Sequence, residues 1–269
     1  MTESNANSFL IKIDKIRNSC YASNIFLKEG DVIVALNNQF YIFGENKFTE
    51  ELKELKKEGG KAILTVLRDT VFFDVIIESS LGCKFLTTSI EETEKIKKDF
   101  SSKENFDADQ LNEYIGMRDA FRRYDVFSNS NSLSAGLFPP MWLAYNQRWW
   151  VLFFFGILGF LLLAVNPFIF LLGWLLTCIY CYKAQLNLLY SFSMLEGKVF
   201  CLKIAANSMD QAHETIRNLD PKSKFRYSKL LPPNIEEIDE NTKKNKDKNP
   251  QENKDNQTNI VDENKEALV

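Results

Sequence analysis

The sequence predicts an α+β protein in which a strand-rich module with two helices precedes an α-helical transmembrane hairpin. Between Leu27 and Arg68, apolar strand patterns alternate with turn residues and one amphipathic helix. From Trp149 to Tyr182 no residue is charged, and this apolar run is longer than a soluble core helix needs. From about Pro232 the chain is rich in Asn, Lys, Glu, Asp and Gln, a composition that does not repay the entropy of ordering, so we expect a disordered tail.

These changes in composition divide the chain into segments. We expect a strand-rich module at 1–88, a helical linker at 89–136, a membrane hairpin at 137–190 with arms at about 149–165 and 168–186, a small strand–helix element at 191–231 and a disordered tail at 232–269.

Turn residues bound each predicted element of the module. Gly30-Asp31, Asn37-Asn38, Gly59-Gly60 and Asp69-Thr70 supply the turns. They bound strands at Val32–Leu36, Ala62–Arg68 and Val71–Glu78 and a helix at Phe48–Lys57, after an earlier strand at Phe9–Ile16 and a short helix at Cys20–Phe26.

The order of these elements carries a family resemblance. The motif L-x-x-G-D-x-I-x-x-x-N starts at Leu27, and the later strand reads L-T-V-L-R-D from Leu64. Over roughly Ser8 to Phe85 the chain resembles the PDZ domains of bacterial HtrA-type and site-2-type proteases. The resemblance implies a PDZ-like sandwich or barrel that binds protein C-termini or extended peptides by adding them to a strand edge beside a helix.

One departure concerns the loop that holds the ligand carboxylate. That family places a G-L-G-φ loop before the strand that starts here at Phe9, where nothing matches, and the nearest candidate is Ser80-Leu81-Gly82-Cys83 at the other end of the module. Its use implies a circularly permuted arrangement. The peptide-binding residues implied by the resemblance are Leu81, Gly82 and Cys83 for the carboxylate and Phe48, Leu52 and Leu55 for the groove.

Core packing is the commoner fate for an apolar stripe such as Phe48, Leu52 and Leu55. If all three belong to the core, the ligand meets Lys53, Glu54 and Lys57 instead. The alternative for the whole module is a small α+β domain whose groove is blocked by its neighbours.

The apolar run predicts a hairpin because Asn166-Pro167 places a turn signal near its middle. Each arm has about 15–17 residues, somewhat fewer than the roughly 20 that span a bilayer. Two short transmembrane helices and a re-entrant hairpin in one leaflet therefore both stay open, and both keep the two ends on one side of the membrane.

Positive charge gathers at the two ends of the hairpin and is absent from its turn. The flanking residues are Arg118, Arg122, Arg123 and Arg148 before it and Lys183, Lys198 and Lys203 after it. The positive-inside rule then predicts a multi-pass protein of the inner (plasma) membrane with both termini in the cytoplasm. The start of the sequence lacks the pattern of a cleavable signal peptide, which agrees with this topology.

A second resemblance covers roughly Tyr114 to Tyr190. The sequence from Leu137 to Trp149, LFPPMWLAYNQRW, resembles the entry to the hairpin in a group of small, uncharacterised bacterial inner-membrane proteins. It implies a bacterial membrane location and no activity.

The segments beside the hairpin also have helical or strand patterns. Ser89–Lys98 and Ala108–Tyr124 are predicted as polar helices, the second lying either on anionic lipid or against the ends of the hairpin. After the hairpin, Lys198–Ala205 is predicted as a strand, and Ser208 with Gln211 as the capping box of a helix.

The end of the tail, Leu268-Val269, is an apolar terminus of the kind that PDZ domains bind. A flexible tether of this length gives an effective concentration near the millimolar range, so the tail is a candidate ligand for the chain's own module. The alternative is coincidence, since many proteins end in an aliphatic residue.

Catalytic and nucleic-acid-binding signatures are absent from the sequence. The net charge of −3 and the lack of a basic stripe exclude nucleic acid as the expected partner. The one histidine, His213, lacks the second histidine of a zinc-protease helix and is expected to be a solvated helix residue. Cys178-x-x-Cys181 has redox spacing but lies in an apolar helix, and the five scattered cysteines favour a reducing compartment.

The sequence therefore predicts a non-catalytic adaptor or scaffold, tethered to the membrane and without metal or cofactor, that binds peptides or proteins in the cytoplasm. The alternative is an accessory subunit of a larger membrane complex, of transport or proteolytic type, with no open peptide groove.

Overall fold

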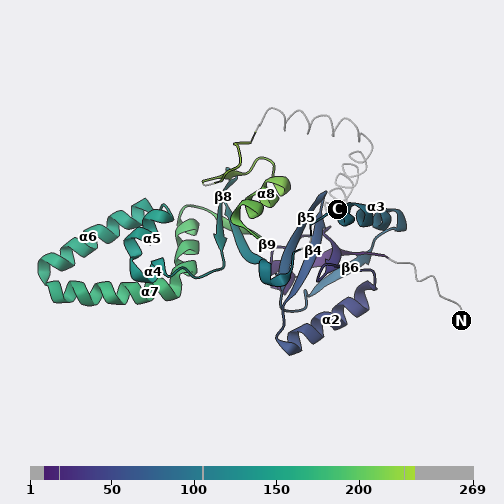
Figure 1. Ribbon diagram of the computed structural model, residues 1–269, viewed down its shortest axis with the longest axis horizontal. Helices are drawn as coiled ribbons and strands as arrows, with labels where there is room; N and C mark the ends of the chain where they lie inside the picture. Colours follow the sequence, from purple (N-terminus) through teal and green to yellow (C-terminus); the bar gives the residue numbers. More distant parts are fainter. Residues whose placement is uncertain (1–8, 18, 105, 227, 234–269) are drawn as a thin grey trace, which may run out of the picture.

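The computed structural model describes residues 9–17, 19–104, 106–226 and 228–233. All ten strands of the described residues join one sheet in the order β10-β8-β7-β9-β5-β4-β2-β1-β6, with β3 paired to β2 (Figure 1). The strands are β1 (Ile11–Ile16), β2 (Val32–Leu36), β3 (Gln39–Phe40), β4 (Ala62–Arg68), β5 (Val71–Ile77), β6 (Cys83–Thr87), β7 (Asn112–Arg118), β8 (Arg123–Ser128), β9 (Val199–Ala206) and β10 (Lys224–Phe225). The helices are α1 (Tyr21–Asn24), α2 (Gly44–Glu58), α3 (Ile90–Ser101), α4 (Ser134–Leu137), α5 (Pro139–Tyr145), α6 (Trp149–Val165), α7 (Pro167–Leu195) and α8 (Met209–Leu219), with a 3-10 turn at Ala108–Gln110.

The mixed α/β character predicted from the sequence is confirmed, and β1, β2, β4 and β5 lie where strands are predicted, whereas β3 and β6 lie where none is predicted. The strands predicted at Val32–Leu36 and Ala62–Arg68 have those bounds, and the predicted helix lies inside the longer α2. Asn37, Asn38 and Asp69 adopt positive φ angles of 49°, 63° and 56°, which is the left-handed conformation that tight turns need. These residues permit the reversals between β2 and β3 and between β4 and β5.

A buried ion pair explains why the G-D turn and the R-D turn occur together. The Arg68 guanidinium donates through Nε to Asp31 Oδ1 at 2.8 Å and through Nη2 to Oδ2 at 2.7 Å. Oδ2 also accepts from the backbone N–H of Lys28 at 2.8 Å. Because the Asp31 side chain is 1% exposed, this two-point contact holds the end of β4 against the turn before β2.

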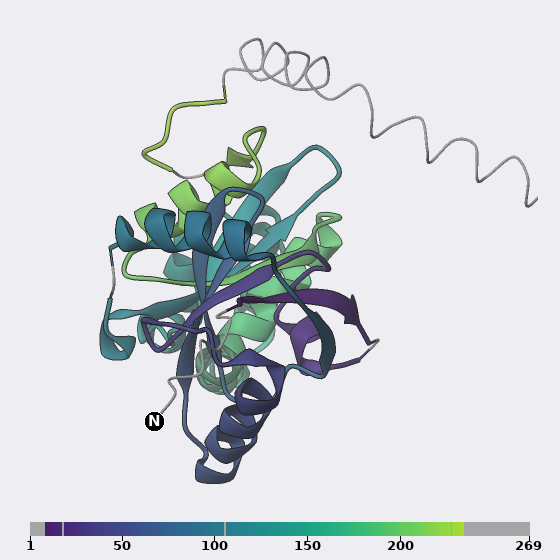
Figure 2. The ribbon, with the colours of Figure 1, turned by 90° about the vertical axis from the view of Figure 1, so that its right-hand side faces the viewer.

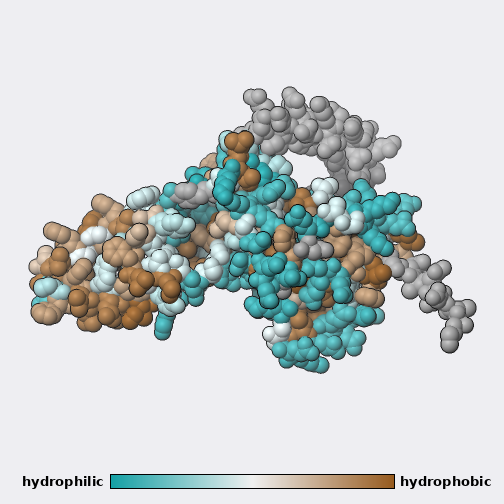
Figure 3. Space-filling model, in the orientation of Figure 1, coloured by the Kyte–Doolittle hydropathy of each residue, from teal (hydrophilic) through white to brown (hydrophobic). Residues whose placement is uncertain are grey.

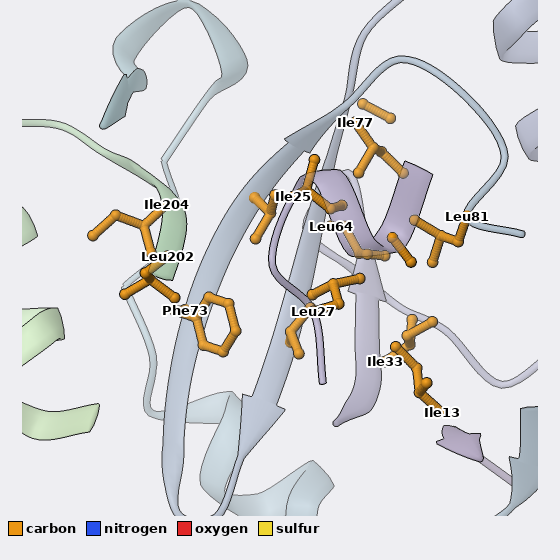
Figure 4. Packing of buried hydrophobic residues seen from close by; sticks show 14 of the residues in the cluster. Ile13, Ile25, Leu27, Ile33, Leu64, Phe73, Ile77, Leu81, Leu202 and Ile204 are labelled. Carbon is orange, nitrogen blue, oxygen red and sulfur yellow. The ribbon is translucent and has the colours of Figure 1, made fainter. Parts of the chain in front are cut away.

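The main core of the part of the chain before β7, here called the first half, contains residues of α1, α2 and strands β1, β2, β4 and β5 (Figure 4). Residues from distant parts of the chain belong to this cluster, and Leu64 and Leu81 lie between Ile77 on one side and Ile13 and Ile33 on the other. The same cluster continues to Leu202 of β9 and to α8. The first half and the second half therefore share one apolar core.

The helix predicted at Ala108–Tyr124 is wrong, because most of this stretch forms the antiparallel pair β7 and β8. Asp119 makes the turn between them: its Oδ1 accepts from the backbone N–H groups of Phe121 at 2.9 Å and Arg123 at 2.8 Å, while Arg122 takes a φ of 59°. Such a side-chain-capped turn competes with helix formation. The helical spacing of Arg118 and Arg122 was misleading.

Arg118 and Arg122 contact a protein carboxylate, and they do not belong to a helix that could lie on lipid. Arg118 Nη1 lies 3.5 Å and Arg122 Nη1 2.5 Å from carboxylate oxygens of Asp220, which follows α8. The arginines therefore fasten the β7–β8 turn to the end of α8.

The hairpin α6–α7 interrupts this second half in sequence without dividing it in space. Strand β9 follows the hairpin, pairs with β7 over Asn112 to Arg118, and meets β5 at Asp74↔Ala205 (Figures 1 and 2). The strand and capped helix predicted after the hairpin are confirmed as β9 and α8, with Ser208 Oγ accepting from Gln211 N–H at 3.3 Å. Strand β9 joins the large sheet between β7 and β5, so this strand–helix element packs on the strands that precede the hairpin.

Removing the charge of Asp31 is expected to destabilise the fold. Asp31→Asn leaves the Arg68 guanidinium, 11% exposed, without its counter-ion, and we expect a loss of about 3–5 kcal/mol in the free energy of unfolding. Urea unfolding of the full chain in mild detergent measures this. Glu78→Gln is the control, because the Glu78–Lys61 pair is more than half exposed on both sides and is expected to matter little. Equal stability of the two variants would contradict the assignment.

Candidate functional site: an open strand edge joined to an apolar hairpin

Strand β6 forms one end of the sheet. It pairs with β1 from Ile11↔Thr87 to Ile16↔Cys83, and its other edge pairs with no strand in the part of the chain that the structure describes. The side chains of Lys84, Leu86 and Thr87 are exposed, Leu86 at 55%. An unpaired strand edge of this kind is a template onto which an extended peptide can add.

The loop before β6 is the one that the sequence singled out for a carboxylate. The N–H groups of Ser80, Leu81 and Gly82 have no hydrogen-bond partner among the described residues. Gly82 has a φ of 73° and is exposed, whereas the Leu81 side chain is buried and its carbonyl accepts from Ala22 N–H at 2.9 Å. The buried leucine anchors the loop while the backbone around Gly82 stays open to solvent.

Helix α2 contacts the inner face of β6 and supplies core residues. The rings of Phe48 and Phe85 meet edge to face at 5.7 Å between centroids. Phe48 and Leu52 are buried in the main core, and Leu55 is half-buried. Core packing thus accounts for Phe48 and Leu52 of the predicted groove stripe.

The exposed face of α2 carries charge in place of that stripe. Lys53, Glu54 and Lys57 are all exposed, as the alternative prediction required of groove residues if the stripe is core. The structure therefore brings Leu81, Gly82 and Cys83 to one end of β6, and Phe48 beside Phe85 of the same strand.

Cys83 opens β6 but has the properties of a structural thiol. Burial raises its pKa to about 12, with the neighbouring Cys20 adding to the effect. A thiol that stays protonated at neutral pH is a poor nucleophile. Its position suits packing at the start of the strand better than chemistry.

The hairpin projects from the sheet as an apolar rod. Brown, hydrophobic surface covers α6 and α7 at the left of Figure 3, while the sheet domain is mostly teal. No residue of α6 is buried, and the buried residues of α7 are Cys181, Gln185, Leu189 and Ser193, which form one stripe near its C-terminal end. The rest of the hairpin leaves its large apolar side chains exposed, and water is an unfavourable solvent for such a surface.

The two helices of the hairpin differ in length. Helix α7 has 29 residues and is long and apolar enough to cross a membrane, whereas α6 is apolar but has 17 residues. At 1.5 Å per residue, α7 is about 43 Å long and α6 about 25 Å. The turn matches the prediction: Asn166 Oδ1 caps α7 by accepting from Phe168 N–H at 2.8 Å, and Pro167 is its first residue.

A buried ionic network joins the base of this hairpin to the sheet. Asp125 of β8 accepts at a single oxygen, Oδ2, from Arg148 Nη2 at 2.9 Å, Lys198 Nζ at 2.6 Å and Ser193 Oγ at 2.9 Å. Glu196, at the end of α7, accepts from Arg148 Nη1 at 2.5 Å and from Lys198 Nζ at 3.0 Å. The side chains of Arg148, Asp125 and Lys198 are 2%, 7% and 5% exposed, so both ends of the hairpin meet one strand through desolvated charges.

The cations of the network lower the pKa values of its two carboxyl groups. Burial alone raises the pKa of Asp125, but hydrogen bonding and charge from Lys198 and Arg148 outweigh it and hold that pKa below its usual value. Glu196 behaves in the same way for the same reason. Both groups are therefore ionised at neutral pH.

Sequence reasoning missed this network. It used Arg148 and Lys198 only as topology signals and did not single out Asp125, Ser193 or Glu196. The available signal was an acid in a strand-forming stretch, Tyr124-Asp125-Val126-Phe127, and a Glu-Gly-Lys turn directly after a long apolar helix.

His213 also differs from its prediction. It is 6% exposed, its ring lies tilted against that of Phe225 at 4.6 Å between centroids, and its Nδ1 has no partner in the described structure. The prediction of a solvated helix residue is wrong because the C-terminal segment with β10 folds over this face of α8. Among the described residues no group of three His, Cys, Asp or Glu side chains is placed to hold a metal ion.

The tail ending in Leu268-Val269 lies outside the described residues. No protein-family model matches the chain, and no curated protein matches it.

The network is expected to make stability depend on pH. Because Asp125 and Glu196 have lowered pKa values in the fold, the unfolded chain binds more protons as pH falls. The stabilisation is therefore complete above about pH 5 and is lost progressively below about pH 4.5, through the unfolded values near 3.9 and 4.3 and on toward the folded ones. Urea unfolding of the full chain in detergent, measured between pH 3 and 7, tests this.

Asp125→Asn tests the source of that dependence. We expect a loss of about 3–5 kcal/mol at pH 7, because Arg148 stays buried with a neutral partner, and a shallower decline with acid. Asp210→Asn, which breaks the exposed pair with Lys229, is the control and is expected to leave both quantities nearly unchanged. An unchanged pH profile in Asp125→Asn would contradict the assignment.

Proposed function

We propose that this protein is a non-catalytic, membrane-tethered adaptor that binds protein C-termini or extended peptide segments along the free edge of β6. The observation that carries the proposal is the pairing of an unpartnered strand edge with three free backbone N–H groups around Gly82. A peptide strand would pair with the edge of β6, and the loop N–H groups would donate hydrogen bonds to its terminal carboxylate. This is the arrangement that the resemblance to PDZ domains implies, in a circularly permuted order.

The hairpin gives the adaptor its location. Its exposed apolar surface supports insertion into a lipid bilayer, and the arginines and lysines at its base support a cytoplasmic position for the sheet. In this proposal both arms cross the inner membrane and both termini are cytoplasmic. A re-entrant hairpin is the alternative, favoured by the short α6.

One observation favours an accessory subunit of a larger membrane complex as a second candidate. The Phe48–Phe85 contact fills part of the space between α2 and β6 that a ligand side chain would occupy. In that case the module would contact a fixed partner through another face.

Peptide binding to the full chain in lipid nanodiscs tests the first proposal. Peptides ending in an aliphatic residue with a free carboxylate, including Glu266-Ala267-Leu268-Val269, are expected to bind saturably, and C-terminal amidation is expected to weaken binding at least about tenfold. A well-folded chain that binds none of them would favour the accessory subunit.

A pair of glycine variants locates the binding loop. At Gly82 an added Cβ would lie 3.0 Å from the Cys20 Cβ at a φ of 73°, so Gly82→Ala is expected to displace the loop and abolish peptide binding. Gly197→Ala is the matched control, since Gly197 has a similar φ of 79° but open space around it. Comparable losses in both variants would argue against the loop.

Accessibility of a cysteine placed at the hairpin turn tests the topology. In a chain whose five native cysteines are replaced by serine or alanine, Asn166→Cys is expected to react with a membrane-impermeant maleimide from the periplasmic side of intact cells. Labelling from the cytoplasmic side alone, in inverted vesicles, would show a re-entrant hairpin.

A further inference from the structure

Two adjoining cavities lie at the base of the hairpin, outside the peptide edge. The first, of about 560 Å³, lies between β8, the turn from α5 to α6, α8 and the segment after β10. The second, of about 690 Å³, lies between β8, α4, α5 and α7. The residues that line both are Val126, Phe127, Tyr145, Asn146 and Met209. The shared lining makes them neighbouring compartments of one site.

Two of the residues that line the first compartment each have a buried polar side-chain atom that no described residue satisfies. Arg148 is 1% exposed and uses both terminal nitrogens in the ionic network, but its Nε has no partner. His213 is 6% exposed, and its Nδ1 also has none. Buried polar groups are normally paired, so two unpartnered atoms in side chains of one cavity lining favour a hydrogen-bonding ligand that these side chains turn to meet. The Arg148 Nε–H can only donate, which requires an acceptor.

The charge of the first compartment favours an anion. Its lining carries Arg148, Arg226 and Lys229 against Asp125 and Asp210, which is a net charge of about +1 with His213 neutral. Asp125 is fully engaged with buried cations, whereas Arg226 has a 3.3 Å contact to Glu196 and a side chain 39% exposed. Arg226 therefore keeps part of its guanidinium exposed, and the remaining titratable groups of the lining are Tyr124 and Tyr145.

The second compartment is apolar and lies at the hairpin. Its lining includes Leu137, Phe138, Met141, Trp142, Leu186 and Leu189. Leu137 and Met141 are 78% and 70% exposed, and α4 lies against α7 at Tyr182, next to Lys183, the one charged residue of α7. A hydrocarbon chain entering here from a bilayer would continue the apolar surface of the hairpin.

We propose that the two compartments together bind a phosphate-bearing amphiphile, with its phosphate oxygens at Arg148 Nε, His213 and Arg226 and its chain in the second compartment. An anionic phospholipid of the surrounding leaflet is the form in which this chemistry is met by a membrane-inserted hairpin. The site lies at the opposite end of the sheet from β6 and does not depend on peptide binding.

The single histidine makes the test direct. With ¹³C-labelled histidine, the full chain in nonionic detergent gives one imidazole signal, that of His213, whose pKa burial holds below its ordinary value. A phosphate beside the ring is expected to raise this pKa and shift the signal saturably. The probes are dihexanoyl phosphatidylglycerol, inorganic phosphate and uncharged dihexanoyl glycerol.

The account expects dihexanoyl phosphatidylglycerol to act at a concentration at least about tenfold lower than inorganic phosphate, and dihexanoyl glycerol to leave the pKa unchanged. Equal potency of phosphatidylglycerol and inorganic phosphate would overturn the role of the apolar compartment. A response to dihexanoyl glycerol equal to that of the phospholipid would overturn phosphate recognition, and no response to any probe would overturn the site.

Two variants distinguish recognition of the phosphate group from recognition of the hydrocarbon chain. Arg226→Gln is expected to weaken both phosphate and phosphatidylglycerol at least about fivefold, and Met141→Glu is expected to weaken only the phospholipid. Arg123→Gln, an exposed arginine of β8 that does not line the cavities, is the matched control and is expected to change neither. Unaltered phospholipid binding in Arg226→Gln, with thermal unfolding like that of the wild type, would contradict the assignment.

Discussion

The structure depends on the desolvated charges that meet at Asp125. A hairpin of two apolar helices has little reason to hold a fixed position on a polar sheet, because hydrophobic contact has no preferred direction. The network supplies that direction: Arg148 enters from the start of α6, and Ser193, Glu196 and Lys198 enter from the end of α7 and the turn into β9. Buried ion pairs contribute little net stability, but breaking one is costly, and this asymmetry favours a single arrangement.

Because the sheet is continuous, the position that the network gives to β8 also fixes the position of β6 at the other edge. Strand β9 leaves the network, pairs with β7 and reaches β5, and from there β4, β2 and β1 lead to β6. The Asp31–Arg68 pair fixes the turn before β2 on the same path. A peptide bound at β6 would then be held at a fixed orientation to the membrane, which distinguishes this arrangement from a binding module on a flexible tether.

The sequence predicts the turns whose conformation is set by the backbone preferences of their own residues. Asn37-Asn38, Asp69-Thr70 and Asn166-Pro167 formed the predicted reversals because their backbone preferences need no tertiary partner. The stretch Ala108–Tyr124 failed because its arginines repeat at helical spacing while Asp119 caps a strand turn, and the strand needs β9 from beyond the hairpin. The network at Asp125 likewise joins residues from before and after the hairpin, and the burial of His213 depends on the later β10 segment, contacts that one sequence alone does not reveal.

The central claim is that sheet and hairpin form one body, so that the edge of β6 keeps one position relative to the hairpin. Electron–electron distance measurement in nanodiscs tests it most directly, with spin labels at the exposed positions Lys84 on β6 and Asn187 on α7 in a cysteine-substituted chain. The account predicts one narrow distance distribution, which Asp125→Asn broadens. A distribution that is already broad or bimodal in the chain with Asp125 intact would contradict it.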